Sequence, residues 1–371
     1  MVISQLMTFI AAFFLIAQAQ PAQPAKPGIS LRISAEQNVI QAGSEMNAKS
    51  NIVTVTLTSA QPRRVRFEEI AYPADTTIKD LAILENGHIW AVGYGGKDSN
   101  NMYYSTDGGR SWIPKSVNSK GWRLNALWFL DNQHGWAVGD SGIILTTTDG
   151  GMSWLESPPP TDYSLIGVRF VNTQVGYVAK AAESGVEVFR TTNGGEKWEK
   201  VYSDYSVPHV FDMSILDAKT AAMSINRGVV LTRDGGETWK KVYSTLAGAG
   251  SVFYTVSGKL WMAVHDVGLY NSDDFGETWK PASSIPSPIP DPVKSTDLLL
   301  LIALPDWLSI AFDGERNGIV VGRNGAIAVT NDAGKSWSKV EVNTKDNLRI
   351  VRFRGGTALA VGFKKAFKMI D

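Results

Sequence analysis

The sequence predicts an all-β protein, a seven-bladed β-propeller built of four-stranded blades. Three observations predict it: an octapeptide occurs six times, each repeat carries four short strand patterns, and incomplete repeats flank the series. The copies run from STDGGRSW to TNDAGKSW, and their acidic or amide markers are Asp107, Asp149, Asn193, Asp234, Asp274 and Asp332. Successive markers are 42, 44, 41, 40 and 58 residues apart. A period near 40 residues with four strands per repeat is typical of propeller blades.

The composition is that of an ordinary globular protein and excludes one class of partner. The 371 residues include 36 Lys and Arg against 36 Asp and Glu, so the formal net charge is zero. Because there is neither a net positive charge nor a long basic run, we expect no nucleic-acid partner. The chain has no Cys, so we expect neither a disulfide framework nor a lipid-anchored Cys.

The first 19 residues have the pattern of a signal peptide. An apolar run of 12 residues, Leu6 to Ala17, is followed by the A-x-A sequence Ala17 to Ala19. A retained membrane helix is the alternative, but spanning a bilayer takes about 20 apolar residues. No Lys or Arg precedes the run. We therefore expect an exported protein, periplasmic or extracellular, with no transmembrane segment after cleavage.

Two segments precede the repeats. Residues 20–28, QPAQPAKPG, are rich in Pro and predict an extended linker. In residues 29–60, Ile29 to Ile33 and Asn51 to Thr58 read as strands, with QAGSE between them. They resemble the opening strands of immunoglobulin-like modules, but about 30 residues cannot close such a sandwich. We expect a β-hairpin extension packed on the main domain.

Each repeat can be divided into strands a to d, counted outward from the middle of the fold. In the second repeat, strand a is Leu124 to Phe129, strand b is Trp136 to Gly139, and strand c leads into the octapeptide. A two-residue hairpin containing Gly is expected between strands b and c, near Asp140 to Gly142. Large residues recur at one position of strand b (Trp90, Trp136, Tyr177, Trp261 and Ile319) and at one position of strand a (Phe129, Phe170, Phe312 and Phe353). We expect these layers to pack between neighbouring blades.

The ends of the repeat region predict how the ring closes. Asn347 to Asp371 supply strands a, b and c without a strand d, whereas Arg64 to Ile70 form a lone strand. Pairing the two completes a seventh blade and removes the exposed edges, so the propeller domain is predicted to span residues 61–371. Residues 281–306 lengthen the fifth step by about 16 residues. Five prolines within residues 281–292 exclude a paired central strand, so this is predicted to be a loop between blades 5 and 6.

The octapeptide is interpreted as a structural turn on the c–d hairpin. The Asp accepts backbone N–H groups, the Gly adopts positive φ, and the Trp covers the blade. Acid–base chemistry by paired carboxylates is excluded because the markers are spread around the rim and cannot converge. The residues assigned to this structural role are Asp107, Trp112, Asp149, Trp154, Asn193, Trp198, Asp234, Trp239, Asp274, Trp279, Asp332 and Trp337.

These octapeptides resemble the Asp-box, or BNR, repeat family. The fuller frame GWAVGDSGIILTTTDGGMSW is similar to propellers of the photosystem II stability and assembly factor-like family. That resemblance covers Arg64 to Asp371 and implies a seven-bladed, non-catalytic binding scaffold. Asp-boxes also occur in sialidases, xyloglucan hydrolases and sortilin-type receptors, so the octapeptide alone does not decide the function.

Candidate binding residues lie on the face opposite the octapeptides, where b–c turns and d–a loops meet. They are Trp122, Arg123, Arg227, His265, Asp266, Arg323 and Lys365. The Arg residues with Lys365 predict a basic patch around the channel mouth; the alternative is that these are solvated turn residues. We expect a monomer without a cofactor that binds a protein partner or a saccharide.

A glycoside hydrolase of sialidase or xyloglucanase type is the alternative function. The early arginine motif of sialidases is absent, and the carboxylates on this face, Asp204 and Asp266, belong to different blades. No metal site is expected, because His209 and His265 lack an obvious third ligand and the remaining two histidines lie in a–b turns.

Overall fold

The computed structural model describes two compact units, which divide between Arg64 and Val65. The described residues are 28–36, 39–47, 65–73, 76–95, 101–115, 117, 123–182, 185–207, 209–226, 228–244, 249–264, 268–282 and 307–370. Within these ranges the secondary structure is β-strand with two short 3-10 turns, and no α-helix is present. The predicted signal peptide and residues 20–27 of the predicted linker lie outside the described residues, whereas Gly28, the last residue of that linker, begins the first described strand.

The described residues of the first unit form an antiparallel hairpin. Strand β1 (Gly28–Glu36) pairs along its whole length with β2 (Val39–Asn47). The prediction placed residues 41–45 in the connection, and this is wrong because they belong to β2. The strand predicted at 51–58 lies outside the described residues.

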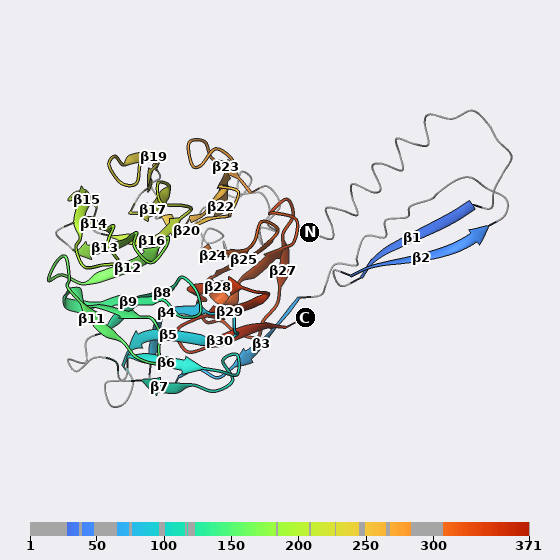
Figure 1. Cartoon of the computed structure of the whole chain (residues 1–371), viewed down its shortest axis with the longest axis horizontal. Helices are drawn as coiled ribbons and strands as arrows, with labels where there is room; N and C mark the ends of the chain where they lie inside the picture. Colours follow the sequence, from blue (N-terminus) through green and yellow to red (C-terminus); the bar gives the residue numbers. More distant parts are fainter. Residues whose placement is uncertain are drawn as a thin grey trace, which may run out of the picture. The chain divides into compact units, whose positions relative to one another are not determined.

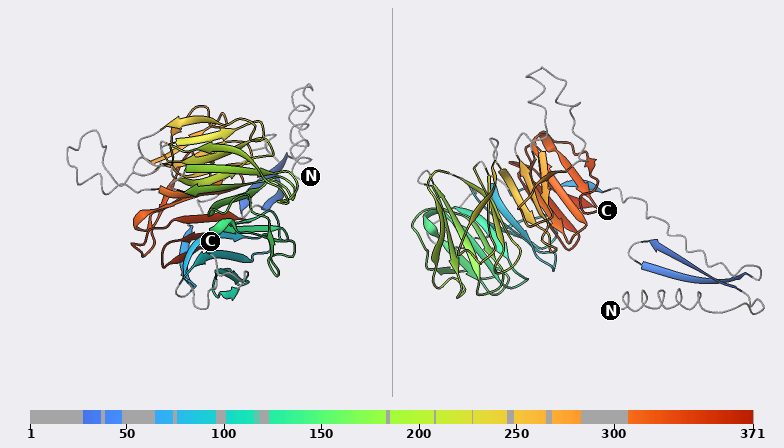
Figure 2. Two further views of the ribbon diagram at one scale, coloured as in Figure 1. Left: turned by 90° about the vertical axis from the view of Figure 1, so that its left-hand side faces the viewer. Right: turned by 90° about the horizontal axis from the view of Figure 1, so that it is seen from above.

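The second unit consists of seven four-stranded antiparallel sheets (Figure 1). Blade 1 contains β4 (Thr77–Ile83), β5 (Ile89–Tyr94), β6 (Met102–Ser105) and β7 (Ile113–Lys115), and blade 2 contains β8 (Leu124–Phe129), β9 (Gly135–Gly139), β10 (Ile144–Thr147) and β11 (Leu155–Ser157). Blade 3 contains β12 (Leu165–Phe170), β13 (Gly176–Ala182), β14 (Gly185–Thr191) and β15 (Glu199–Asp204), and blade 4 contains β16 (Val210–Ile215), β17 (Ala221–Ile225), β18 (Gly228–Thr232) and β19 (Lys240–Ser244). Figure 2 shows the blades from two further directions.

The remaining blades follow the same order. Blade 5 contains β20 (Ala249–Tyr254), β21 (Leu260–Val264), β22 (Gly268–Ser272) and β23 (Lys280–Pro281), and blade 6 contains β24 (Trp307–Asp313), β25 (Asn317–Gly322), β26 (Ile327–Thr330) and β27 (Ser338–Val340). Blade 7 contains β28 (Ile350–Arg354), β29 (Thr357–Val361), β30 (Ala366–Ile370) and, as its outermost strand, β3 (Arg66–Ile70). The a strands β4, β8, β12, β16, β20, β24 and β28 contact one another in sequence, and β28 returns to β4. The predicted seven-bladed propeller is confirmed.

Closure of the ring joins strands from opposite ends of the unit. Strand β3 pairs antiparallel with β30, with Arg66 opposite Ile370 and Ile70 opposite Ala366. The early strand therefore supplies strand d of the last blade, as the incomplete repeats predict. Blade 7 therefore has the same strand order as the other six blades, with strand a at the inner edge and strand d at the outer edge.

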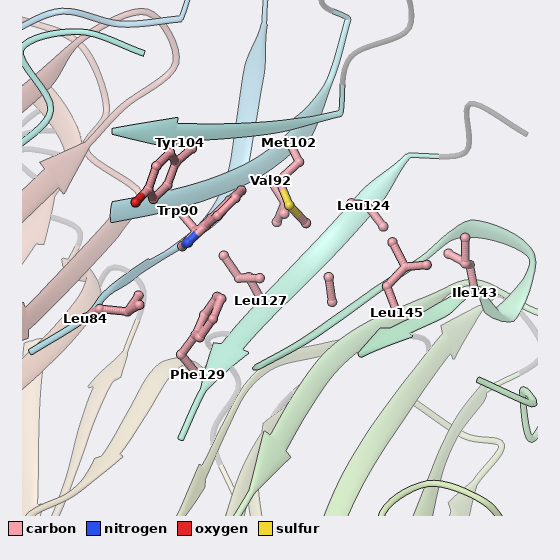
Figure 3. Close-up of a cluster of buried hydrophobic side chains, with 11 residues drawn as sticks. Leu84, Trp90, Val92, Met102, Tyr104, Leu124, Leu127, Phe129, Ile143 and Leu145 are labelled. Atoms are coloured by element: carbon pink, nitrogen blue, oxygen red, sulfur yellow. The ribbon is translucent and has the colours of Figure 1, made fainter. Parts of the chain in front are cut away.

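The core lies between neighbouring blades, as the recurring large residues predict. Figure 3 shows the cluster between blades 1 and 2, where Trp90 and Tyr104 from one blade lie beside Leu127 and Phe129 from the next. The ring centroids of Trp90 and Tyr104 are 4.4 Å apart. Each buried aromatic removes about 150 to 250 Å² from water, so these layers supply much of the attraction between blades.

Two connections differ from the sequence prediction. In blade 2 the b–c connection is a three-residue 3-10 turn, Asp140–Gly142, in which Ser141 has a φ of 55°, and not a two-residue hairpin. The predicted loop at 281–306 begins one residue later, because Pro281 still pairs with Tyr270 in β22. Pro281 is tolerated there because β23 is the outermost strand of its sheet. Residues 283–306 lie outside the described part of the chain.

Candidate functional site

The Asp-box turns are held by hydrogen bonds between polar groups of the turn itself. In the turn of blade 2, Asp149 Oδ1 accepts the Thr147 hydroxyl at 2.7 Å and the Ser153 N–H at 2.9 Å, while Oδ2 accepts the Ser153 hydroxyl at 2.5 Å. These donors, the Ser153 hydroxyl foremost, lower the pKa of Asp149 to about 2. The turn is thus an ionised, internally satisfied hairpin with no group left for proton transfer.

The other five turns repeat this pattern with one chemical difference. Asn193 accepts the Thr191 hydroxyl at 2.9 Å and the Lys197 N–H at 3.0 Å through its single oxygen. The equivalent bonds are made by Asp107, Asp234, Asp274 and Asp332. All six turns lie at the c–d end of the blades, so the binding site must be sought elsewhere.

The central channel, at the axis of the ring, is a cavity of about 530 Å³. All seven a strands line it, joined by Arg323 from a b–c turn and by Asn347 and Arg349, which precede β28. The cavity is thus bounded by every blade of the ring. Concave sites with a few convergent polar groups are the usual places for ligands.

A β-bulge places one side chain of most a strands at the channel. Register shifts of this kind occur near the start of β4, β8, β12, β16, β20 and β24. A bulge leaves an extra residue outside the ladder and redirects its side chain. The residues at this level of the seven blades, which we call the mouth ring, are Lys79, Asn125, Ile166, Phe211, Gly250, Leu308 and Arg349.

The mouth ring lies near the b–c face. Each a strand begins after a d–a loop, on the side of the b–c turns, and runs toward the Asp-box side. Because the bulges fall within the first few residues of these strands, their side chains lie toward the end of the channel opposite the Asp-boxes.

Two ion pairs lie deeper in the channel. Arg352 Nη2 is 2.5 Å from Asp80 Oδ1, joining blade 7 to blade 1, and Arg169 Nη2 is 3.2 Å from Asp212 Oδ1, joining blade 3 to blade 4. The Asp80 and Arg169 side chains are only 5% and 11% exposed. Burial of an unpaired charge is costly, so each ion pair neutralises two charged side chains that neighbouring blades bury in the channel wall.

The two arginines differ in their electrostatic surroundings. Burial lowers the pKa of Arg169, against the opposing effect of Asp212. Burial also acts against the charge of Arg352, but Asp80 and Asp212 outweigh it and raise its pKa. Arg352 is therefore the more firmly cationic of the two.

The channel carboxylates are fully engaged. Asp80 also accepts the Leu81 N–H at 2.8 Å and the Leu127 N–H at 3.1 Å. Asp212 accepts the Met213 N–H at 2.8 Å and the Ser251 hydroxyl at 2.6 Å. Carboxylates held by several donors suit a fixed wall better than an acid or a base that must exchange protons.

The residues predicted as binding candidates have different positions. Arg323 lines the channel. Arg123 lies 4.6 Å from the ring centroid of Tyr94, which Lys79 also approaches at 5.3 Å. Lys365 makes a 2.7 Å ion pair with Glu69 on the outermost strand of blade 7. Trp122, Arg227, His265 and Asp266 lie outside the described residues, and the binding role of the whole set stays a prediction.

Apart from Arg323, the residues that line the channel are not among the candidates predicted from the sequence. A sequence pattern marks four of these residues, because each stands four positions before the recurring Phe of strand a. They are Asn125, Ile166, Leu308 and Arg349. Alternation alone does not show which residue reaches the axis, since a bulge shifts the pattern by one position. Those bulges became visible only in the paired strands.

Two further features concern metal ions and membranes. In the described ranges, no group of three or more His, Cys, Asp and Glu side chains is arranged to hold a metal ion. His88 Nδ1 is 2.7 Å from the Tyr104 hydroxyl, and His134 Nδ1 is 2.9 Å from Asp131 Oδ2. No helix among the residues that the structure describes is long and apolar enough to span a membrane.

Comparisons with known sequences identify relatives. A family model described as photosynthesis system II assembly factor YCF48 matches residues 38–145 and 122–252, together more than half of the chain. The photosystem II assembly lipoprotein Ycf48 of Synechococcus sp. (strain CC9902) is 26% identical over 320 residues, covering 80% of this chain and 84% of that protein. The chloroplastic photosystem II stability/assembly factor HCF136 of Arabidopsis thaliana is 25% identical over 278 residues, covering 67% and 64% respectively.

Solved structures agree on the fold. A structure of YCF48 bound to a D1 peptide has a TM-score of 0.63 at 21% identity and covers 85% of this chain and all of that one. The GH74 xyloglucanase from Xanthomonas campestris has a TM-score of 0.61 at 12% identity, covering 82% of this chain and 53% of that one. At these identities the likeness concerns the propeller fold alone.

Proposed function

The chain belongs to the photosystem II assembly factor YCF48 family, and we propose that it is a non-catalytic scaffold that binds a segment of a protein partner at the channel mouth. The observation that carries this proposal is the family match combined with the cationic channel. Its described lining contains five cationic side chains and two acidic ones, and both acidic side chains are paired with arginines. The surplus positive charge favours a partner with carboxylates.

The partner that we propose is a D1-type protein segment. The solved YCF48 structure contains a D1 peptide, and this chain has the same fold and family. Arg349, Arg323 and Lys79 are exposed at the channel, where an incoming carboxylate would meet them. Exposed charges at the rim of a site chiefly raise the association rate and set specificity.

Binding of a fluorescein-labelled D1 peptide to the purified full chain tests this function. We expect saturable binding by fluorescence anisotropy, weakened about tenfold by Arg349→Ala, which corresponds to about 1.4 kcal/mol. Lys339→Ala is the matched control, because Lys339 lies on the outer strand β27 and pairs with Glu341. Absence of binding by the unaltered protein, or equal affinity in both variants, would reject the proposal.

The glycoside hydrolase alternative has less support from the described channel. Hydrolysis needs one carboxyl group that gives up a proton and a second that activates water or attacks the sugar. The channel carboxylates in the described wall, Asp80 and Asp212, are instead committed to arginines and backbone N–H groups. Release of sugar from a β-glucan or a sialoside by the purified protein would restore this alternative.

We also propose that this chain is exported, and two observations support this. Its relatives are named as a lipoprotein and a chloroplastic factor, and residues 1–19 carry the pattern of a signal peptide. Secretion of the mature chain with Gln20 as its first residue, read by N-terminal sequencing, would support export. An intact Met1 in the recovered protein would contradict it.

A further inference from the structure

The mouth ring is chemically divided into two halves. Blades 3, 4 and 6 contribute Ile166, Phe211 and Leu308, which we call the apolar arc. Blades 7 and 1 contribute Arg349 and Lys79, which we call the basic arc. Gly250 of blade 5 lies within the apolar arc, between Phe211 and Leu308, and Asn125 of blade 2 lies between the two arcs. Equivalent positions of a repeated fold therefore carry different chemistry on opposite sides of one opening.

Phe211 is the most distinctive member of the apolar arc. This residue is 45% exposed although it stands near the start of β16, the innermost strand of blade 4. His209 lies beside it, with ring centroids 6.3 Å apart. A large apolar side chain held in water at the rim of a channel gains free energy when a partner covers it, because apolar surface is then removed from solvent.

A second exposed aromatic residue precedes Phe211 in the sequence. Tyr205, which directly follows the outermost strand of blade 3, is 64% exposed. Its hydroxyl donates to Glu187 Oε1 at 3.2 Å, and Lys180 and Lys200 hold that same carboxylate at 3.1 Å each. An aromatic ring fixed in this way loses little conformational entropy on binding, which is how preorganised contacts gain affinity.

The division of the ring decides between kinds of ligand. A polyanion such as a nucleic acid would place charge against Ile166, Phe211 and Leu308 and lose hydration without compensation. A wholly apolar ligand would leave Arg349 and Lys79 beside a surface that cannot pair with them. A segment with a carboxylate on one side and an apolar side chain on the other satisfies both arcs.

We propose that the channel mouth binds an extended protein segment in a single orientation, with an apolar side chain on the apolar arc and a carboxylate on the basic arc. The proposal rests on the proposed function in taking this mouth as the binding site. It adds the chemistry of the segment and the direction in which the segment lies. It also assigns Phe211 as the residue that contacts the apolar side chain of the segment.

Three labelled decapeptides test the orientation with the full chain. The first carries Leu-Phe followed by Glu-Glu in a Gly/Ser background, the second has Ser-Ser in place of Leu-Phe, and the third has Gln-Gln in place of Glu-Glu with an amidated end. We expect the first to bind about tenfold more tightly than either of the others. Labelled deca-glutamate is the polyanion probe and should bind no better than the second peptide.

Variants assign each half of the peptide to an arc. Phe211→Ala should weaken the first peptide about tenfold and leave the second unchanged, whereas Arg349→Gln should weaken the first and leave the third unchanged. Phe275→Ala is the matched control, since Phe275 is 39% exposed in the Asp-box turn of blade 5, on the face opposite the mouth ring. Phe211→Leu should retain most of the affinity, and equal melting temperatures exclude misfolding as the cause.

The outcomes separate this proposal from the proposed function. If the D1 peptide binds and Phe211→Ala changes neither its affinity nor that of the first decapeptide, the family function stands and the orientation is wrong. If the D1 peptide fails to bind but the first decapeptide binds in a Phe211-dependent way, the partner is wrong and the orientation stands. No binding of the first decapeptide, or stronger binding of deca-glutamate, overturns the proposal.

Discussion

At the scale of single residues, the Asp-box turns combine a fixed acceptor with an unusual backbone. The residue after the marker adopts positive φ in every turn, at values between 74° and 82° where it is Gly. Phe275 and Ala333 take this position in blades 5 and 6 with φ of 62° and 64°. Residues with a Cβ pay about 1 to 2 kcal/mol for this conformation.

Ala333→Gly should therefore stabilise the propeller. Relief of the left-handed strain exceeds the extra entropy that Gly has in the unfolded chain, which costs about 0.4 to 1 kcal/mol. We expect a gain of about 0.5 to 1 kcal/mol in the free energy of unfolding, measured by urea denaturation.

The reverse change at an equivalent turn is the control. Gly150 has a φ of 76°, and a Cβ there would lie 2.7 Å from the Asn132 carbonyl oxygen, so Gly150→Ala should destabilise. A loss of stability in Ala333→Gly would show that the alanine methyl group contributes more than its strained backbone costs.

At the scale of elements, the strand that closes the ring decides whether the blades form one unit. Among the described strands, β3 pairs with β30, which lies about 300 residues away in the sequence, and with no strand near it. Ile70 is buried, and Phe67 packs against the core between blades 6 and 7. Such a strand lies far from its partner in sequence and is therefore expected to pair late in folding.

Two truncations separate the closing strand from the residues before it. Removal of residues 1–64 leaves β3 in place and should leave the melting temperature nearly unchanged. Removal of residues 1–70 exposes the edge of β30, loses the burial of Ile70, about 1.5 to 3 kcal/mol, and loses the partial burial of Phe67. We expect the second variant to melt at a clearly lower temperature and to aggregate.

Differential scanning calorimetry of both truncated chains provides the measurement. If the two melt at the same temperature, the β3–β30 pairing contributes nothing to closure. If removal of residues 1–64 is already as damaging as removal of 1–70, the residues before β3 carry the effect.

At the scale of the whole molecule, the channel wall ties together blades that are distant in sequence. Arg352 reaches Asp80, and Arg354 from the same strand reaches Glu85 at 2.8 Å. Both pairs join blade 7 to blade 1, the seam at which the ring closes. The seam is thus held from the outside by β3 and from the inside by these ion pairs.

Asp80→Ala should be strongly destabilising. It leaves the Arg352 guanidinium and the Leu81 and Leu127 N–H groups without their acceptor. Removing one partner of a buried ion pair costs about 3 to 5 kcal/mol. Urea denaturation of the full chain measures the loss.

The double variant distinguishes the ion pair from simple packing. Arg352→Met together with Asp80→Ala removes both charges, so it should recover part of the stability that Asp80→Ala loses. Two results would contradict a stabilising role of the Asp80–Arg352 ion pair where blade 7 meets blade 1. One is a loss of unfolding free energy below about 1 kcal/mol in Asp80→Ala, and the other is strictly additive losses in the double variant.

The sequence by itself determined the repeat, the number of blades, the closing strand and the layers between blades. Each of these is a local pattern that recurs at a fixed spacing. The recurring Trp residues of strand b and Phe129, Phe170 and Phe312 are buried as that spacing predicts, whereas Phe353 is partly buried. The N-terminal hairpin was harder to place, because a single pair of strands has no repeat to set its register. Its second strand accordingly forms at Val39–Asn47.

Only the tertiary structure decided what lines the channel. Asp80 and Arg352 are 272 residues apart in sequence, and no local pattern relates them. The mouth ring depends on bulges that shift the alternation of each a strand, and on the circular order that places Phe211 and Arg349 around one opening. Periodicity determines a repeated scaffold, whereas a site on its axis is made of the positions at which the repeats differ.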